Sequence, residues 1–221
     1  MIIALVPAYN ESERIAGVVR GLLGVVNTVL VINDGSTDDT ESVAQNAGAI
    51  VITHPFNLGQ GAALETGHEF ARAQNADWVV HFDGDGQFEP ADISRALNFA
   101  IEKKVDVVFG SRFIGQNNKS IPWFKRRIIL PVARPINQWF SGLKLRDVHN
   151  GFRVFNNHAL GKIHLTQNRM AHATEFSQQV KAHHLSFAEF PVTVTYNEFG
   201  QGMGAGFQII RDLIFGQLTK N

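Results

Sequence analysis

Short apolar runs alternate with amphipathic stretches over the first half of the chain. A continuously apolar run is typical of a strand that is buried on both faces, as in a parallel sheet. Such runs predict strands at residues 2–6, 28–32, 49–53, 78–82 and 105–110. Between them, apolar positions at helical spacing predict helices at about residues 15–23, 37–46, 61–73 and 91–101. This alternation indicates an α/β fold, with a mostly parallel sheet covered by helices on both faces.

Ser36 or Thr37 is expected to cap the second of these helices. The pattern changes after residue 112, where residues 121–140 mix aromatic with cationic side chains and three prolines predict short helices. Beyond that segment we expect strands near residues 152–155 and 190–195, and helices near residues 174–183 and 206–218. No repeat, low-complexity tract or linker interrupts the sequence, so a single domain over residues 1–221 is predicted.

The composition limits the class of protein. With 221 residues, 44% of them hydrophobic and 18% charged, the chain can bury a sizeable core. The absence of Cys excludes a disulfide framework and thiolate metal sites, so a metal would need oxygen or imidazole ligands. The N-terminus has no basic segment, and no run approaches the ~18 apolar residues of a spanning helix. We therefore expect a cytoplasmic protein without a signal peptide or a transmembrane helix.

Charge is balanced over the chain but segregated along it. The total of 20 basic and 20 acidic residues argues against a protein that coats nucleic acid. Residues 1–112 carry 7 Lys or Arg and 15 Asp or Glu, whereas residues 113–146 carry 7 basic residues and no acidic one. The basic aromatic segment, residues 119–146, suits a surface that meets anionic lipid headgroups. The alternative is a pair of amphipathic helices packed on the sheet or in a dimer.

Polar residues follow the predicted strands at one edge of the sheet, where ligands of such folds bind. They are Tyr9 and Glu11, Asp34, Asp83 and Asp85, and Ser111 and Arg112. Asp83 and Asp85 are separated by one Gly and can hold one Mg²⁺ or Mn²⁺, which would neutralise a departing diphosphate. The alternative for this pair is an ordinary turn that ends a strand.

Two further segments suggest a nucleotide site. Asp34 can accept hydrogen bonds from a base or a ribose. Residues 57–63 are rich in Gly and open a helix, so a phosphate could rest on their backbone amides. Leu64 stands where a dinucleotide fingerprint needs its third Gly, which argues against a nicotinamide or flavin site. None of the nine His residues forms a metalloprotease pattern, and surface or packing roles are expected for most of them.

Six motifs appear in order along the chain. They are residues 5–11 (Leu-Val-Pro-Ala-Tyr-Asn-Glu), 31–40 (Val-Ile-Asn-Asp-Gly-Ser-Thr-Asp-Asp-Thr), 57–61 (Asn-Leu-Gly-Gln-Gly), 83–87 (Asp-Gly-Asp-Gly-Gln), 110–113 (Gly-Ser-Arg-Phe) and 147–155 (Asp-Val-His-Asn-Gly-Phe-Arg-Val-Phe). This order resembles family 2 glycosyltransferases, and most closely the dolichyl-phosphate mannose synthase and polyprenyl-phosphate glycosyltransferase branch. The resemblance covers nearly the whole chain. It implies a GT-A fold, with a Rossmann-like nucleotide-sugar-binding half at residues 1–112 and an acceptor-binding half at residues 113–221.

The resemblance also implies an activity: inverting transfer of a hexose from a UDP- or GDP-sugar to polyprenyl phosphate. The implied nucleotide-sugar contacts are Pro7, Tyr9, Glu11, Asp34, Gly59 and Asp83. The implied ligands of Mg²⁺ or Mn²⁺ are Asp83, Asp85 and Gln87. Arg112 and Arg153 would lie near the diphosphate or an anionic acceptor, and Asp85 would be essential for the reaction. A hydroxyl acceptor would need a general base, for which Asp147 and Glu175 are the candidates, whereas a phosphate acceptor would need none.

Several alternatives stay open on the sequence alone. Glu175 can be an ordinary acid in the first turn of a helix. Asn33 stands where many relatives carry Asp, and His149 and Asn150 stand where small residues or Cys are common, which leaves the donor sugar open. A glycan hydroxyl in cell-surface polysaccharide synthesis is the alternative acceptor. More distant alternatives are a haloacid dehalogenase-like phosphohydrolase and a non-enzymatic membrane-surface binding module. Membrane attachment would be peripheral, at the inner face, or through a membrane-protein partner.

Overall fold

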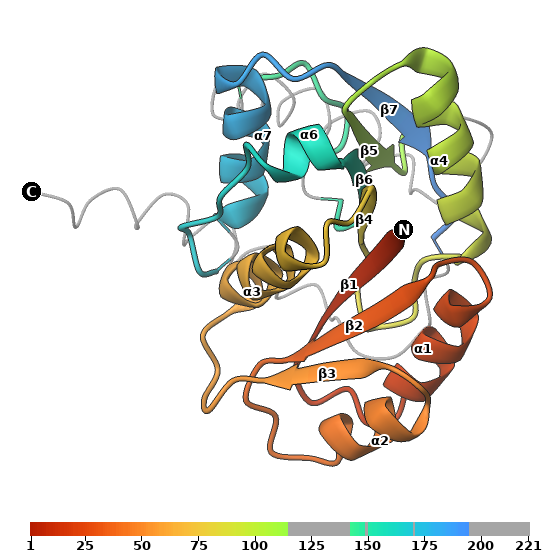
Figure 1. The fold of residues 1–221 in the computed structure, drawn as a ribbon, viewed down its shortest axis with the longest axis vertical. Helices are drawn as coiled ribbons and strands as arrows, with labels where there is room; N and C mark the ends of the chain where they lie inside the picture. The colour runs from red at the N-terminus through yellow and green to blue at the C-terminus, as the bar shows by residue number, and fades with distance from the viewer. Residues whose placement is uncertain (115–141, 149, 170, 195–221) are drawn as a thin grey trace, which may run out of the picture.

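A computed structural model describes residues 1–114, 142–148, 150–169 and 171–194 (Figure 1). The described residues form a seven-stranded sheet in the order β3-β2-β1-β4-β6-β5-β7. The strands are β1 Ile2–Ala8, β2 Thr28–Asn33, β3 Ile50–Thr53, β4 Trp78–His81, β5 Val107–Ser111, β6 Arg153–Asn156 and β7 Phe187–Pro191. The helices are α1 Ile15–Leu23, α2 Thr40–Asn46, α3 Gln60–Ala73, α4 Ala91–Lys103, α6 Asn157–Leu160 and α7 His172–Ala182.

The sheet is mostly parallel, as the alternating pattern predicts. β1 pairs in parallel with β2 and β4, β2 with β3, and β5 with β7. The exception is β6, which inserts antiparallel between β4 and β5. Because β6 belongs to the 147–155 motif, this insertion carries the motif into the centre of the sheet, beside the strand that precedes Asp83.

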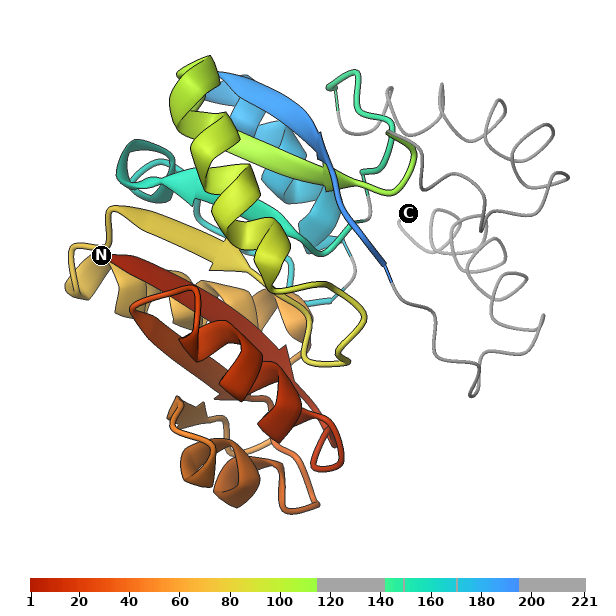
Figure 2. The same ribbon diagram turned by 90° about the vertical axis from the view of Figure 1, so that its right-hand side faces the viewer.

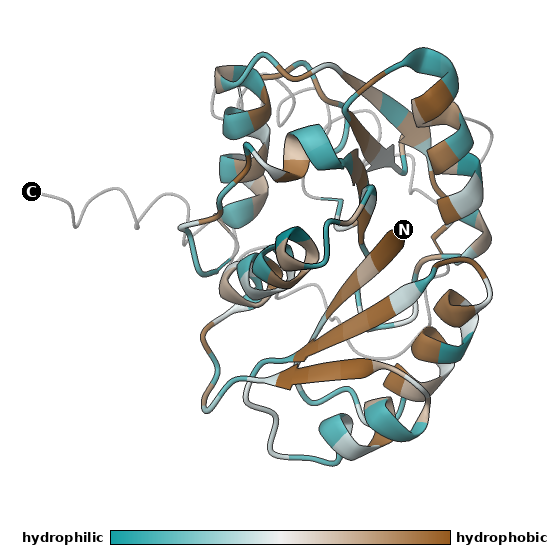
Figure 3. Cartoon of the chain, in the orientation of Figure 1, coloured by the Kyte–Doolittle hydropathy of each residue, from teal (hydrophilic) through white to brown (hydrophobic). Residues whose placement is uncertain are grey.

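The helices cover both faces of the sheet (Figures 1 and 2). Alternation along β1 sends Ala4 and Val6 into the core beneath α1, α2 and α4, and Ile3 and Leu5 into the core beneath α3, α6 and α7. The strands are apolar along nearly their whole length, whereas the helices carry polar residues on their outer sides (Figure 3). The predicted α/β architecture of the GT-A type is thereby confirmed.

Most predicted boundaries lie within two residues of those in the structure, and two predictions differ by more. The last predicted strand, residues 190–195, is found at Phe187–Pro191, because its pairing with β5 ends where Ser111 faces Pro191. Ser36 and Thr37 do not cap α2, which begins at Thr40. Both contact the first loop instead: the Asn10 backbone N–H donates to Ser36 Oγ, and the Thr37 backbone N–H donates to Asn10 Oδ1, each at 2.9 Å.

Part of the predicted acceptor-binding half lies outside the described residues. This includes residues 115–141, which hold most of the basic aromatic segment, and the predicted helix at residues 206–218. In the part of the chain that the structure describes, no helix has both the length and the apolar character needed to cross a membrane. The single domain over residues 1–221 stays a prediction.

Candidate active site

The ends of the parallel strands bring the predicted site residues to one edge of the sheet. Asp83 follows β4, and it lies between residues from two other elements. Gln60, the first residue of α3, donates from Nε2 to Asp83 Oδ1 at 3.0 Å. Gly151 lies directly against the Asp83 carboxylate, so closely that a Cβ on Gly151 would overlap it. The 147–155 motif and the 83–87 motif therefore form one site.

Asp83 and Asp85 are the acidic pair of this site. Burial raises the pKa of Asp83 to about 6, and the charge of Asp85 adds to the rise, partly offset by the charge of Arg153. The backbone N–H of Gln87 donates to Asp85 Oδ1 at 3.0 Å, which fixes the turn that carries the second carboxylate. Two carboxylates that repel each other fit a divalent cation, which prefers oxygen ligands and completes its shell with water and phosphate.

The described residues would supply only part of such a shell. Within residues 1–114, 142–148, 150–169 and 171–194, no three or more His, Asp or Glu side chains gather as a metal site. A cation at this edge would take its remaining ligands from outside the described residues, and water and a diphosphate are of the kind that Mg²⁺ prefers. Gln87 is close in sequence, but no contact of its side chain with either carboxylate is established, so its predicted role as a ligand stays a prediction.

Arg112 and Asp147 form a bidentate ion pair. Arg112 Nε and Nη2 donate to Asp147 Oδ2 and Oδ1, both at 2.8 Å, and the Arg112 backbone N–H donates to Oδ2 at 3.1 Å. Asn150 Nδ2 donates to the same Oδ2 at 3.3 Å. Because the Asp147 side chain is buried, this pair fixes the plane of the guanidinium. Asp147 would have to give up these donors to act as a general base.

Arg153 lies on β6, directly opposite His81 on β4. Its side chain is buried, and its guanidinium carbon lies 5.1 Å from the centre of the Phe176 ring. Burial lowers the pKa of Arg153 to about 10, against the opposing charges of Asp83 and Asp147. The group therefore stays a cation at neutral pH, and it places positive charge behind the acidic pair.

The residues predicted to contact the nucleoside lie at the end of β1. Tyr9 is 48% exposed, and Pro7 is half-buried within the strand. Glu11 is held from two sides: its backbone N–H donates to Thr40 Oγ1 at 2.8 Å, and Arg14 Nη1 donates to its Oε2 at 3.1 Å. The exposed ring of Tyr9 is therefore the group in this loop that a base could most readily contact.

Asp34 has a different environment from the one that its sequence position predicts. Its side chain is buried, and the backbone N–H groups of Leu58 and Gly59 donate to its Oδ1 and Oδ2 at 2.9 and 2.7 Å. His54 Nδ1 lies 2.7 Å from Oδ1. The carboxylate thus organises the loop between β3 and α3. Its predicted contact with a nucleoside stays a prediction.

The phosphate cradle predicted at residues 57–63 is wrong for five of its amides, one of which is that of Ala63, which donates to the Gly59 carbonyl oxygen at 3.1 Å. The amides of Leu58 and Gly59 donate to Asp34, as described above, and those of Gly61 and Ala62 donate to the Asn168 carbonyl oxygen at 2.8 and 3.4 Å. Because these donors are used within the chain, they are not offered to a phosphate. Gly59 adopts φ 100° against residues 168–169, where a side chain would collide. Its predicted contact with the nucleotide sugar stays a prediction.

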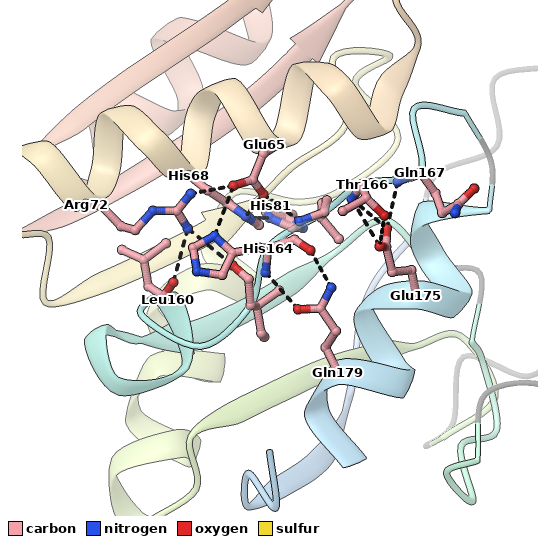
Figure 4. Close-up of polar contacts among 12 residues, drawn as sticks. Glu65, His68, Arg72, His81, Leu160, His164, Thr166, Gln167, Glu175 and Gln179 are labelled. Carbon is pink, nitrogen blue, oxygen red and sulfur yellow. Dashed lines mark hydrogen bonds and ion pairs between the residues drawn. The ribbon is translucent and has the colours of Figure 1, made fainter. Parts of the chain in front are cut away.

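Glu175 lies in the first turn of α7, as the simpler of its two interpretations predicts. Its carboxylate accepts from the Thr166 backbone N–H and hydroxyl at 3.0 and 2.6 Å, and from the Gln167 backbone N–H at 2.9 Å (Figure 4). These bonds hold the loop before α7. A role as general base stays a prediction, and it would require Glu175 to release this loop.

Sequence reasoning missed the partners of the predicted residues. Gln60 and Gly151 touch Asp83, and His54 contacts Asp34, from far along the chain. Gln60 and Gly151 do belong to motifs that the sequence singled out, and this is the signal that could have marked them. No pattern in the sequence marks the buried pair formed by His68 and His81, in which the Nε2 atoms lie 2.7 Å apart (Figure 4).

The fold and the site together define a class: an α/β protein with an acidic pair after one strand and two arginines whose charges act on Asp83 of that pair. Comparison with known proteins identifies the class more closely. The model of a family described as "Glycosyl transferase family 2" matches residues 3–163. The chain belongs to this family. The predicted membership is thereby confirmed, and a glycosyltransferase is the enzyme class.

Curated relatives agree with the predicted branch. The chain is 28% identical over 245 residues to a UDP-N-acetylglucosamine–dolichyl-phosphate N-acetylglucosaminyltransferase of Methanococcus voltae, covering 100% of this chain and 97% of that one. It is 31% identical over 223 residues to the glycosyltransferase AglJ of Haloferax volcanii, covering 98% and 70%. The relatives thus include an enzyme named for dolichyl phosphate, which confirms the resemblance to the polyprenyl-phosphate branch.

Solved structures confirm the fold. The glucosyl-3-phosphoglycerate synthase of Mycobacterium tuberculosis, in complex with Mn²⁺, UDP and glucosyl-3-phosphoglycerate, matches with a TM-score of 0.71. The match covers 97% of this chain and 77% of that one. At 18% sequence identity, it shows a shared fold and nothing about activity.

Proposed function

We propose that this glycosyltransferase moves a hexose, with inversion, from a UDP- or GDP-hexose to polyprenyl phosphate, and that it requires Mg²⁺ or Mn²⁺. The observation that carries the proposal is that the charges of Asp85, Arg153 and Arg112 all act on Asp83 at one edge of the sheet. Two carboxylates for a cation and two guanidinium groups for phosphate oxygens suit a reaction in which a nucleoside diphosphate leaves.

Each group has a distinct task in this proposal. Asp83 and Asp85, with Gln87 as a further candidate, hold the cation, which neutralises charge on the diphosphate when it is bound. Tyr9, with Pro7, Glu11 and Asp34 around it, forms the nucleoside end of the site. Arg112, fixed by Asp147, and Arg153, fixed by burial, orient the anionic groups and absorb charge that develops on the leaving oxygen.

The side chains of the site favour a phosphate acceptor over a hydroxyl. A hydroxyl acceptor needs a general base, and both candidates already accept several hydrogen bonds: Asp147 from Arg112, and Glu175 from the loop at residues 166–167. A phosphate oxygen is ionised at neutral pH and attacks without a base. The relative named for dolichyl phosphate supports the same choice. A glycan hydroxyl stays the second candidate, and it would require one of these carboxylates to be released.

The lipid acceptor implies contact with a membrane. We propose peripheral attachment at the cytoplasmic face, through the basic aromatic segment at residues 119–146 or through a membrane-protein partner. The segment carries cations and no acidic residue, as anionic headgroups require.

The proposal is tested by transfer of radiolabel from a panel of UDP- and GDP-hexoses to polyprenyl phosphate in the presence of Mn²⁺ or Mg²⁺. We expect label in the organic phase with one donor, and a loss of about 10²–10³-fold or more in Asp85→Asn, because the site loses a charge at the diphosphate. Asp39→Asn is the matched control, since Asp39 is exposed and caps no helix through its side chain. Full activity in Asp85→Asn would overturn the assignment of the acidic pair.

A second outcome separates the two acceptors. If no label enters the organic phase but a nucleotide sugar binds together with the cation, the lipid acceptor is wrong and a glycan hydroxyl takes its place. In that case Asp147→Asn and Glu175→Gln become the variants that identify the base.

A further inference from the structure

Two histidines are buried side by side behind the site. His68 on α3 and His81 on β4 are 0% and 1% exposed, and their rings stack with centroids 5.0 Å apart. The Nε2 atoms lie 2.7 Å apart, a distance at which one nitrogen must donate a proton to the other (Figure 4). Both rings are fully buried, and His81 lies directly opposite the buried cation Arg153, so a charge on either ring would be costly and both are neutral.

Glu65 fixes where the protons of this pair lie. Its carboxylate oxygen Oε2 is 3.1 Å from His68 Nδ1. An ionised carboxylate can only accept, so Nδ1 of neutral His68 carries the proton and its Nε2 is bare. His81 therefore donates from Nε2, and His81 Nδ1 is left as a bare lone pair. The tautomers of both rings thus follow from one half-buried carboxylate.

The residue opposite His81 carries a donor that also lacks a partner. Among the described residues, His81 Nδ1 and Arg153 Nε are both buried side-chain atoms without a hydrogen-bond partner. His81 and Arg153 are directly opposite on the antiparallel strands β4 and β6, so their side chains project on the same face. Both contact Phe176: the centroids of the His81 and Phe176 rings are 5.5 Å apart, and the guanidinium carbon of Arg153 lies 5.1 Å from the Phe176 centroid. One atom is an acceptor and the other a donor, and each is costly to bury alone.

We propose that His81 is a positioning residue for Arg153: its bare Nδ1 accepts the Nε–H of Arg153 during the reaction. This inference rests on the proposed role of Arg153 at the diphosphate. The guanidinium is planar, so a bond at Nε sets the plane and leaves the two terminal Nη groups for anions at the strand ends. The chain from Glu65 through His68 to His81 then determines which way the arginine points.

Two substitutions at His81 separate this role from a merely structural one. His81→Gln places an amide near the position of Nε2, so it keeps the contact with His68 and loses the acceptor at Nδ1. His81→Asn places an amide near the position of Nδ1 and loses the contact with His68. We expect His81→Gln to lower kcat by about 10–100-fold with little change in KM for the donor, and His81→Asn to retain more of kcat than His81→Gln. His183→Gln, an exposed residue at the end of α7, is the control.

The opposite ranking would overturn the proposal, because a structural role through His68 requires Gln to be the better substitute. Arg153→Lys keeps the charge but lacks the fork and its Nε–H. We expect its loss of kcat not to add to that of His81→Gln. Fully additive losses would show that the two residues act separately. Full activity of Arg153→Lys would instead contradict the proposed role of Arg153 at the diphosphate, whatever His81 does.

A readout that needs no activity keeps the inference testable if the variants fold poorly or if no donor is transferred. In the ¹⁵N-labelled wild-type protein with UDP and Mg²⁺, we expect a protonated Nε2 and a bare Nδ1 at His81. We also expect a resolved Nε–H signal of Arg153 that is coupled to His81 Nδ1. A proton on His81 Nδ1, or an Arg153 Nε–H signal that does not couple to His81, would overturn the pairing.

Discussion

At the scale of single residues, the acidic site depends on a glycine from another motif. Asp83 lies against Gly151, and a Cβ at Gly151 would overlap the carboxylate group itself. Gly151 thus leaves the space in which Asp83 sits between Gln60 and β6. A methyl group there would push the carboxylate away from the position from which it could share a cation with Asp85.

Gly151→Ala should therefore reduce transfer more than it reduces stability. We expect kcat/KM to fall by about 100-fold or more, because a displacement of about 1 Å at a reacting centre has effects of this size. Gly161→Ala is the matched control: a Cβ at Gly161 meets only ordinary contacts, at 3.6 and 3.8 Å. Transfer rates of both variants over a range of donor concentrations measure kcat/KM, and unfolding by urea measures their stability. Equal activity of the two variants would contradict the close packing of Gly151 on Asp83.

At this scale the sequence predicts which side chains lie at the sheet edge. It does not predict which residues form hydrogen bonds or ion pairs with them. Asp83, Asp85 and Arg112 follow apolar runs, so their place at the sheet edge follows from the pattern. The ion pair between Arg112 and Asp147 depends on how a distant segment folds back, and no spacing encodes it. For the same reason, the burial of Asp34 beneath the loop before α3 could not be predicted.

At the scale of elements, two helices differ in how closely their glycines approach the sheet. Gly67 lies in the middle of α3, and a Cβ there would meet Leu5 Cδ1 at 2.9 Å and Ile32 Cδ1 at 3.2 Å. Gly17 lies in α1 on its exposed side, and a Cβ there would meet nothing within 4 Å. The first glycine lets α3 lie close against β1 and β2, which brings Gln60 towards Asp83, whereas the second has no packing role.

The same substitution should consequently have opposite effects at these two positions. Gly17→Ala should stabilise the protein by about 0.5–1 kcal/mol, the usual gain of Ala over Gly within a helix. Gly67→Ala should destabilise it by about 1–3 kcal/mol, because the added methyl overpacks a dense core. Unfolding by urea at one pH measures both. A Gly67→Ala variant as stable as Gly17→Ala would show that α3 can move away from the sheet at little cost.

The elements of the first half were predictable, and those of the second half were less so. Strands such as β1 and β2 are buried on both faces and contain a continuous apolar run, so the sequence pattern predicts them. β7 is an edge strand with Glu189 among its five residues, so its pattern is weak, and the prediction was displaced towards the apolar residues that follow. The antiparallel insertion of β6 depends on pairing between distant segments. The spacing of apolar residues along the sequence does not predict such pairing.

At the scale of the whole molecule, a charge cluster around Glu65 joins the two halves of the described chain (Figure 4). Arg72 forms an ion pair with Glu65 and donates from Nη1 to the Leu160 and Ile163 carbonyl oxygens, both at 3.2 Å. The Leu165 backbone N–H donates to Glu65 Oε2 at 2.7 Å. One carboxylate on α3 therefore anchors the segment between β6 and α7, which is the segment that packs behind the site.

Because this anchor is a carboxylate, the stability of the fold depends on pH. Burial alone would raise the pKa of Glu65, but hydrogen bonds from His68, Leu165 and Arg72 outweigh it and hold the pKa at about 2, below the ordinary 4.5. Between these values the unfolded chain binds more protons than the folded one, so stability is fully present above about pH 4.5 and is lost as the pH falls towards 2. The shift corresponds to about 3 kcal/mol as an order of magnitude.

Urea unfolding of wild type and Glu65→Gln over a series of pH values should reveal this contribution. We expect Glu65→Gln to be less stable by about 2–4 kcal/mol near neutral pH, and the difference to shrink as the pH falls below about 4.5, because acid neutralises the wild-type carboxylate as well. Glu102→Gln is the control, since that side chain is 76% exposed and its difference from wild type should stay small throughout. A difference for Glu65→Gln that does not change with pH would mean that shape, and not charge, makes this residue the anchor between the halves.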